Sequence, residues 1–203
     1  MPREPRRRAY DGTVRRYVIQ DGGEAFIRFD DTLAEPKPER YFVGPRLLLR
    51  ELISRQLHLQ ASKAETDFVT NKFMQSILQG PNGPDLSFVL GVLNSRLMSW
   101  YFLHRSSIAQ RDDFPKIVLK ETRSLPIPDL NTSIPKDKAA HDRMVELVDS
   151  MLALHKQLAA AKSEAQKDVF QRQIAATDAQ IDRLVYDLYG LTPEEIAFVE
   201  SEA

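Results

Sequence analysis

The sequence contains no cysteine, and its hydrophobic runs are short. The first absence excludes disulfides, zinc–thiolate sites and thiol nucleophiles. The longest apolar run, at 86–93, contains a serine and a glycine and falls well short of the roughly 18 residues that span a bilayer. The arginine-rich N-terminus has no apolar segment behind it, so no secretory signal is predicted. We expect a cytoplasmic protein without a membrane partner.

Groupings of catalytic residues are also missing from the sequence. It has no glycine-rich phosphate loop, and Gly22-Gly23 is better explained as a turn. Asp112-Asp113 indicates an acidic loop, because no carboxylate at helical spacing accompanies it. The four histidines lie far apart, with no triad or metal-ligand pattern around them: His58, His104, His141 and His155. We therefore predict no catalytic, metal-binding or cofactor-binding residue in this chain.

The composition is that of a folded chain with an uneven charge distribution. Hydrophobic residues make up 42% of the 203 residues, and the net charge is only −1. Residues 1–130 carry 20 Lys+Arg against 16 Asp+Glu, a net of +4, whereas residues 131–203 carry 8 against 13, a net of −5. The asymmetry favours two modules with different partners. We place them at 1–130 and 131–203.

The first module reads as β-rich with one amphipathic helix. Segments 13–19 and 25–29 are aromatic and β-branched, and the turn residues Asp21-Gly22-Gly23 between them predict a hairpin. Asp85 is a good N-cap for a helix that we expect to end near His104. Apolar residues recur along it at spacings of three and four and form one face. Further strands are predicted at 41–43, 46–50, 57–61, 68–69, 73–78 and 117–120.

The second module reads as an antiparallel pair of helices. Two heptad-like seams run from Met144 to Ala165 and from Phe170 to Leu188. A turn near 162–167 would let the seams bury each other, whereas without it they would form one long rod; we favour the hairpin. Gly190 suits the end of the second helix, and Thr192-Pro193-Glu194-Glu195 is a capping box that starts a short last helix. The predicted fold class is α+β, with a coiled-coil-like helical hairpin.

Basic and aromatic residues interleave along the predicted strands, as in Arg16-Tyr17, Arg40-Tyr41 and Lys72-Phe73. Arginine can hold phosphates and guanine edges through its bidentate fork, and Asn71 could contact an adenine edge. The competing interpretation is a solvated strand face over a core. From the pattern alone, that structural interpretation is the better one.

Several longer segments point to a family. Residues 40–50 (RYFVGPRLLLR) and 88–97 (FVLGVLNSRL) are followed by FPKI at 114–117, LPIP at 125–128 and IDRLVYDLYGLTPEE at 181–195. In this order, over about 13–200, the chain resembles the C-terminal specificity domain of TaqI-like DNA adenine methyltransferases, including fused restriction–modification enzymes. The family's catalytic Asn-Pro-Pro-aromatic motif and its methyl-donor loop are not in this sequence.

The resemblance implies a target-recognition domain. Such a domain clamps double-stranded DNA against a separate catalytic domain or subunit, which is a methyltransferase or an endonuclease. The target-recognition domain also helps to position the adenine that is flipped out for methylation. S-adenosylmethionine would be bound by the catalytic domain, so this chain would not be an enzyme by itself. It would be a fragment, a truncated gene product or a stand-alone specificity subunit. The helical hairpin would act as a spacer and docking surface.

Candidate DNA contacts are chosen by charge and by position near strand ends and loops. They are Arg46, Arg50, Arg55, Lys63, Asn71, Lys72, Arg105 and Lys116. For each one singly, a solubilising surface charge is an equally good explanation. Two other functions stay open. One is a protein-interaction module of a restriction–modification or phage-defence complex, with a homodimer through the hairpin; the other is an enzyme with an unrecognised site.

Overall fold

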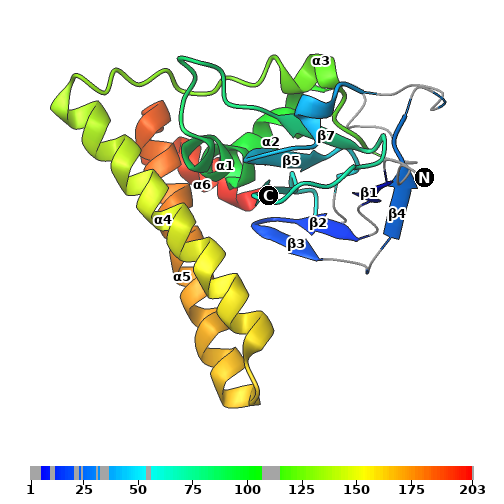
Figure 1. Ribbon diagram of the computed structural model, residues 1–203. Helices are drawn as coiled ribbons and strands as arrows, with labels where there is room; N and C mark the ends of the chain where they lie inside the picture. Colours follow the sequence, from blue (N-terminus) through cyan, green and yellow to red (C-terminus); the bar gives the residue numbers. More distant parts are fainter. Residues whose placement is uncertain are drawn as a thin grey trace.

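The computed structural model describes residues 6–9, 12–20, 23, 25–30, 32, 37–53, 56–106 and 115–202. Three small antiparallel sheets lie beside a helical layer, and a long helical hairpin projects from one side (Figure 1). The strands are β1 (Arg6–Ala9), β2 (Thr13–Arg15), β3 (Val18–Gln20), β4 (Ala25–Arg28), β5 (Arg46–Arg50), β6 (Ala61–Ala64) and β7 (Met74–Ile77). The helices are η1 (Glu39–Tyr41), α1 (Leu86–Asn94), α2 (Arg96–Arg105), α3 (Leu119–Thr122), α4 (Pro135–Ala160), α5 (Glu164–Tyr189) and α6 (Pro193–Ser201).

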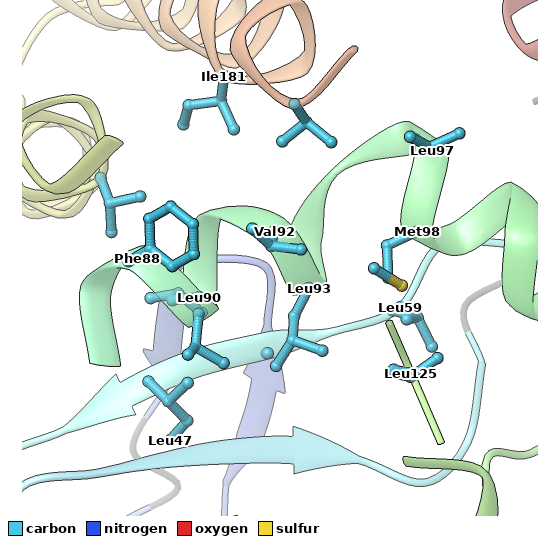
Figure 2. Close-up of a cluster of buried hydrophobic side chains, with 14 of the residues drawn as sticks. Leu47, Leu59, Phe88, Leu90, Val92, Leu93, Leu97, Met98, Leu125 and Ile181 are labelled. Atoms are coloured by element: carbon cyan, nitrogen blue, oxygen red, sulfur yellow. The ribbon is translucent and has the colours of Figure 1, made fainter. Parts of the chain in front are cut away.

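The central sheet has the order β6-β5-β7, with all pairs antiparallel. Leu47 belongs to the main core, where α1 packs on the sheet through Leu90 and Leu93 (Figure 2). Leu48 belongs to a smaller cluster with Val14 that lies on the other face. Because β5 is covered on both faces, its three central residues are all buried leucines and do not alternate with polar residues.

The predicted pairing of 13–19 with 25–29 is wrong. β2 instead pairs with β3, with Val14 opposite Ile19, and β4 pairs with β1. Tyr17 reverses the chain between β2 and β3: its φ is 62°, a left-handed conformation that suits a tight turn. The Tyr17 amide donates to the carbonyl of Ala61 at 2.9 Å, so a contact with β6 stabilises the turn. The predicted turn residues Asp21 and Gly22 lie outside the described residues.

Several other local predictions need correction. Residues 41–43 are the end of η1 and a turn, and of the strand expected at 57–61 only Ala61 belongs to a strand, β6. The expected single helix ending near His104 is two helices, α1 and α2, which meet at a 63° bend. Ser95 causes the break, because its hydroxyl donates to the Val92 carbonyl and accepts from the Met98 amide, capping the second helix. The second half of the strand expected at 117–120 is the start of α3, where the Glu121 carboxylate accepts from the Val118 amide at 3.0 Å.

The helical hairpin is confirmed. α4 and α5 are joined by residues 161–163, and the Ser163 hydroxyl caps the second helix. Their inward-facing side chains join the same core as α1; these are Met144, Leu147, Val148 and Met151 from α4, with Ile181 and Val185 from α5. Gly190 ends α5 at φ 67°, and Thr192 and Glu195 form the predicted capping box. The turn of the hairpin points away from the sheets (Figure 1).

Asn94 closes the outer edge of β6. Its side-chain carbonyl accepts from the Ala61 amide, and its amide donates to the Ala61 carbonyl, both at 3.0 Å. The Ser99 hydroxyl accepts from the neighbouring Leu59 amide at 3.2 Å. An exposed strand edge would leave these backbone groups available to other chains, so the end of α1 and the start of α2 seal one side of the sheet.

The observed architecture confirms the α+β class with its helical hairpin. The division at residue 130 stays a prediction; one hydrophobic core runs from Leu47 through α1 to Val185 of α5. Within the described ranges, no single helix is both long and apolar enough to cross a membrane, and α1 with α2 would reach that length only as a pair, across their bend.

Candidate nucleic-acid interface

Four of the eight predicted contact residues lie around the C-terminal end of β5. Arg50 stands opposite Met74, and the amide of the next residue, Glu51, donates to the Phe73 carbonyl at 2.9 Å. This brings the loop with Asn71 and Lys72 to the end of the sheet. On the same stretch, Leu52 forms a β-bridge with Lys116. Lys72, Asn71 and Lys116 are exposed and Arg50 is half-buried.

Arg46 does not reach the surface. Its side chain is 0% exposed, and its guanidinium donates to the carbonyls of Gly44 (2.8 Å), Thr66 (3.0 Å) and Phe68 (3.1 Å). The same group stacks on the Phe68 ring, 4.6 Å from its centre, and burial lowers its pKa. We therefore assign Arg46 a structural role, holding the two loops at the start of β5, in place of the predicted DNA contact.

The other predicted residues do not join this group. Lys63 lies on β6, with its ammonium 3.4 Å from the Ser87 hydroxyl and 3.9 Å from Glu65. Arg105 is exposed in the last turn of α2, 5.7 Å from the centre of the Tyr101 ring. Arg55 lies outside the described residues.

A groove of about 510 Å³ runs along the outer edge of β7, between this strand, α1, α3 and the segment with η1. In Figure 1, η1 and α3 lie beside β7. The walls are mainly apolar: Ile77, Leu78, Val89, Leu93, Leu119 and Ile127 line the groove. Polar lining comes from Glu51, Gln75, Ser76, Thr122 and Tyr41, and two cations, Lys37 and Arg123, complete it.

Tyr41 is surrounded by positive charge. The Arg40 guanidinium donates to its hydroxyl at 3.2 Å and stacks 5.1 Å from the ring centre. The hydrogen bond and charge of Arg40, assisted by Arg123 and Lys37, lower the pKa of Tyr41. The sequence pattern had marked Arg40-Tyr41 as a basic–aromatic pair. It gave no signal that Lys37 and Arg123 would join the pair, because only the fold places α3 beside η1.

Seven cations belong to the segments around β7 and the end of β5, and we call them the β7-edge cations: Lys37, Arg40, Arg50, Lys72, Lys116, Lys120 and Arg123. In the described part of the chain, none of them forms an ion pair within 4.0 Å of a carboxylate. On the hairpin, by contrast, Arg143 pairs with Glu146 and Lys167 with Glu164, both at 2.7 Å. The β7-edge cations are therefore free to contact an anionic partner.

The most buried carboxylates have structural partners. Asp182 accepts from the Arg96 amide at 2.8 Å, at the start of α2, and burial raises its pKa to about 6. Asp178 pairs with Arg16 in the β2–β3 turn, at 2.5 Å. Among the described residues, no cluster of three or more histidine, aspartate or glutamate side chains could hold a metal ion.

Comparisons with known proteins agree with this architecture. The chain is 29% identical over 189 residues to a Methanocaldococcus jannaschii protein named "Putative type II restriction enzyme and methyltransferase RM.MjaORFECS2P". That match covers 91% of this chain but only 15% of the relative.

A solved structure has the same fold at low sequence identity. It is the type IIL restriction–modification enzyme MmeI in complex with DNA, with a TM-score of 0.50 and 13% identity. The match covers 78% of this chain and 21% of the MmeI chain. Residues 7–127 match the model of the TaqI-like C-terminal specificity domain. The chain therefore belongs to the TaqI-like C-terminal specificity domain family.

Proposed function

We propose that this chain recognises double-stranded DNA sequence-specifically, as the specificity domain of an adenine-specific DNA methyltransferase or restriction–modification enzyme. The observation that carries the proposal is that, on a domain of this family, the β7-edge cations have no carboxylate partner within the described part of the chain. Phosphates carry most of the charge of DNA, and unpaired lysine and arginine side chains are the groups that neutralise them. A surface whose cations were already paired with carboxylates would gain less from such contacts.

Affinity and base choice would come from different residues. Lys72 and Lys116, exposed at the end of the central sheet, are proposed phosphate contacts. Arg50 and Asn71 lie beside them and carry the side chains that pair with base edges, a guanidinium for guanine and an amide for adenine. The Asn71 side-chain oxygen already accepts from the Phe73 amide at 2.9 Å, so its amide donors remain for a base. Arg105 and Lys63 stand apart and would extend the contact to a partner or a second strand.

Catalysis would belong to a separate domain or subunit. The chain spans about a seventh of the length of the curated relative that it matches. We propose that S-adenosylmethionine and the methyl-transfer residues reside in that partner, and that DNA is held between the two. Because this domain would then make only part of the contacts with DNA, its own affinity for DNA would be modest and would depend strongly on salt concentration.

The test is a fluorescence titration of the chain with duplex DNA at two salt concentrations. The double variant Lys72→Gln/Lys116→Gln should lower the slope of log affinity against log salt by about 1.8, since each phosphate contact contributes about 0.9. The matched control, Lys162→Gln/Arg172→Gln, removes two exposed charges from the far end of the hairpin and should leave the slope unchanged. Absence of binding at low salt, also when the chain is joined to a catalytic partner, would refute the proposal.

The second candidate function is assembly through the hairpin. Val169 is exposed, and Phe170 and Ile174 are only partly covered, toward the turn end of α5. A second copy or another helical protein could bury this apolar surface. Sedimentation of the full chain would decide: a dimer that Val169→Glu dissociates favours assembly, while a monomer favours a spacer.

A further inference from the structure

We propose that the groove along β7 binds a single unstacked nucleotide, with its base against Tyr41 and the apolar walls and its phosphate on Lys37 and Arg123. The groove would then be a site for one base on the surface that is proposed to bind duplex DNA. If the nucleotide is part of a DNA strand, this inference rests on the proposed function. If it is a free nucleotide, the inference is independent of that function, because the same groups would bind it.

The walls of the groove suit the flat faces of a base. Val89 and Leu93 come from the buried face of α1, and Ile77 comes from the edge strand. Leu119, 51% exposed, stands at the rim, where an apolar side chain of this size gains from being covered. The volume of about 510 Å³ lies within the range of small-molecule sites, roughly 300–1,000 Å³. One nucleotide therefore fits without a change in the core.

Tyr41 supplies a ring whose position is fixed. Arg40 bonds to its hydroxyl and packs on the ring, and the Tyr41 carbonyl accepts from the Ser76 hydroxyl of β7 at 2.9 Å. A ring held in this way loses little freedom when a base stacks on it. Stacking on an aromatic side chain is the common way in which proteins hold an unpaired base.

Charge distinguishes a nucleotide from an uncharged aromatic ligand. Lys37 and Arg123 line the groove, and neither has a carboxylate partner in the described part of the chain. Among the described residues that line it, Glu51 is the single acidic one, and it faces two cations. Its carboxylate accepts hydrogen bonds, which favours a base with an exocyclic amino group, such as adenine. An acidic peptide would also meet the cations, but the Tyr41–Arg40 stack favours a planar ring.

The probes are a matched duplex, the same duplex with one bulged adenine, free dAMP and an alternating Glu-Leu decapeptide, each titrated against the full chain. The bulged duplex should bind roughly tenfold more tightly than the matched one, which corresponds to about 1.4 kcal/mol. Tyr41→Leu should abolish this preference. Leu119→Gln, at an exposed position, should weaken it and provides a variant with little risk to folding. Tyr101→Leu, which removes another tyrosine packed beside an arginine, is the matched control and should keep the preference.

The outcomes separate this inference from the proposed function. Equal binding of matched and bulged duplexes, with no binding of dAMP, overturns the inference and leaves duplex recognition standing. Binding of dAMP that Tyr41→Leu removes, with no duplex binding, supports the site as one for a free nucleotide and refutes the proposed function. Binding of the decapeptide that Tyr41→Leu weakens, with no preference for the bulge, overturns the nucleotide assignment in favour of a peptide groove.

Discussion

Replacing Gly91 by alanine should destabilise the protein, although alanine is the better helix former. A Cβ at this position would lie 2.3 Å from Sδ of Met144 and 3.0 Å from Cγ2 of Val148. Both side chains are fully buried on α4, so a shift of either one moves it against other core residues. Overpacking of this kind costs about 1–3 kcal/mol, while the change from glycine to alanine in a helix returns about 0.5–1 kcal/mol. We expect a net loss of about 1 kcal/mol in the free energy of unfolding.

A double-mutant cycle with Met144 tests the cause. Met144→Ala alone should cost about 2–5 kcal/mol through the cavity it leaves. In that background the closest contact of the new methyl group, with Sδ of Met144, is gone and only the 3.0 Å contact with Val148 remains, so Gly91→Ala should become neutral or stabilising. The coupling between the two changes should therefore be about 1–2 kcal/mol, measured by urea denaturation of the four proteins.

Two results would refute the reasoning. One is an increase in stability from Gly91→Ala in the wild-type background. The other is an equal effect of Gly91→Ala in both backgrounds, which would mean that Met144 is not the obstacle. Ser150→Ala, at an exposed position of α4, is the control and should stay within about 0.5 kcal/mol of wild type.

Three other changes should act through buried polar groups. Asn94→Ala should cost about 1–3 kcal/mol in chemical denaturation, because it leaves the buried amide of Ala61 without a partner, while the Ala61 carbonyl keeps its hydrogen bond from the Tyr17 amide; a loss below 1 kcal/mol would contradict that role. Arg46→Gln should cost about 2–4 kcal/mol in the same assay, since three carbonyls lose a charged donor and one of them, that of Phe68, is buried. Burial raises the pKa of Asp182 to about 6 from an unfolded value near 3.9, so its contribution to stability is present below about pH 4 and is lost as the pH rises through 6. Asp182→Asn keeps the acceptor for the Arg96 amide and should therefore gain about 2 kcal/mol relative to wild type between pH 4 and pH 7, and parallel pH profiles would exclude this effect.

The segments that carry the family resemblance are mainly structural here. In the segment 88–97, the missing side chain of Gly91 lets α4 pack closely against α1. Asn94 hydrogen-bonds the free edge of β6, and Ser95 caps the start of α2. Asp182, in 181–195, caps the first turn of α2. A resemblance that rests on scaffold residues predicts the fold well, because these contacts define it. It says little about the surface, where side chains can change without altering the scaffold.

The difference between scaffold and surface residues explains why the prediction of Arg46 as a DNA contact failed. On a strand that starts and ends with arginine, both residues looked equally able to contact DNA, yet Arg46 is buried and Arg50 is half-exposed. Nothing in the strand itself distinguishes them. The carbonyls that surround Arg46 come from the loop before β5 and from residues 66–68, which follow β6, so its burial depends on chain segments distant in sequence.

The sequence by itself determined the start of α1, the two long helices of the hairpin and the last helix, but not the break at Ser95 or helix α3. The signals of the predicted helices are local: apolar residues every three or four positions, Asp85 and Thr192 before helices, and Gly190 after one. Only the tertiary structure decided which strands pair, which arginine is buried, and that Lys37 and Arg123 meet at Tyr41. The physical reason is range: a helix forms from hydrogen bonds within a few residues, whereas strand register and surface clusters depend on contacts between distant segments.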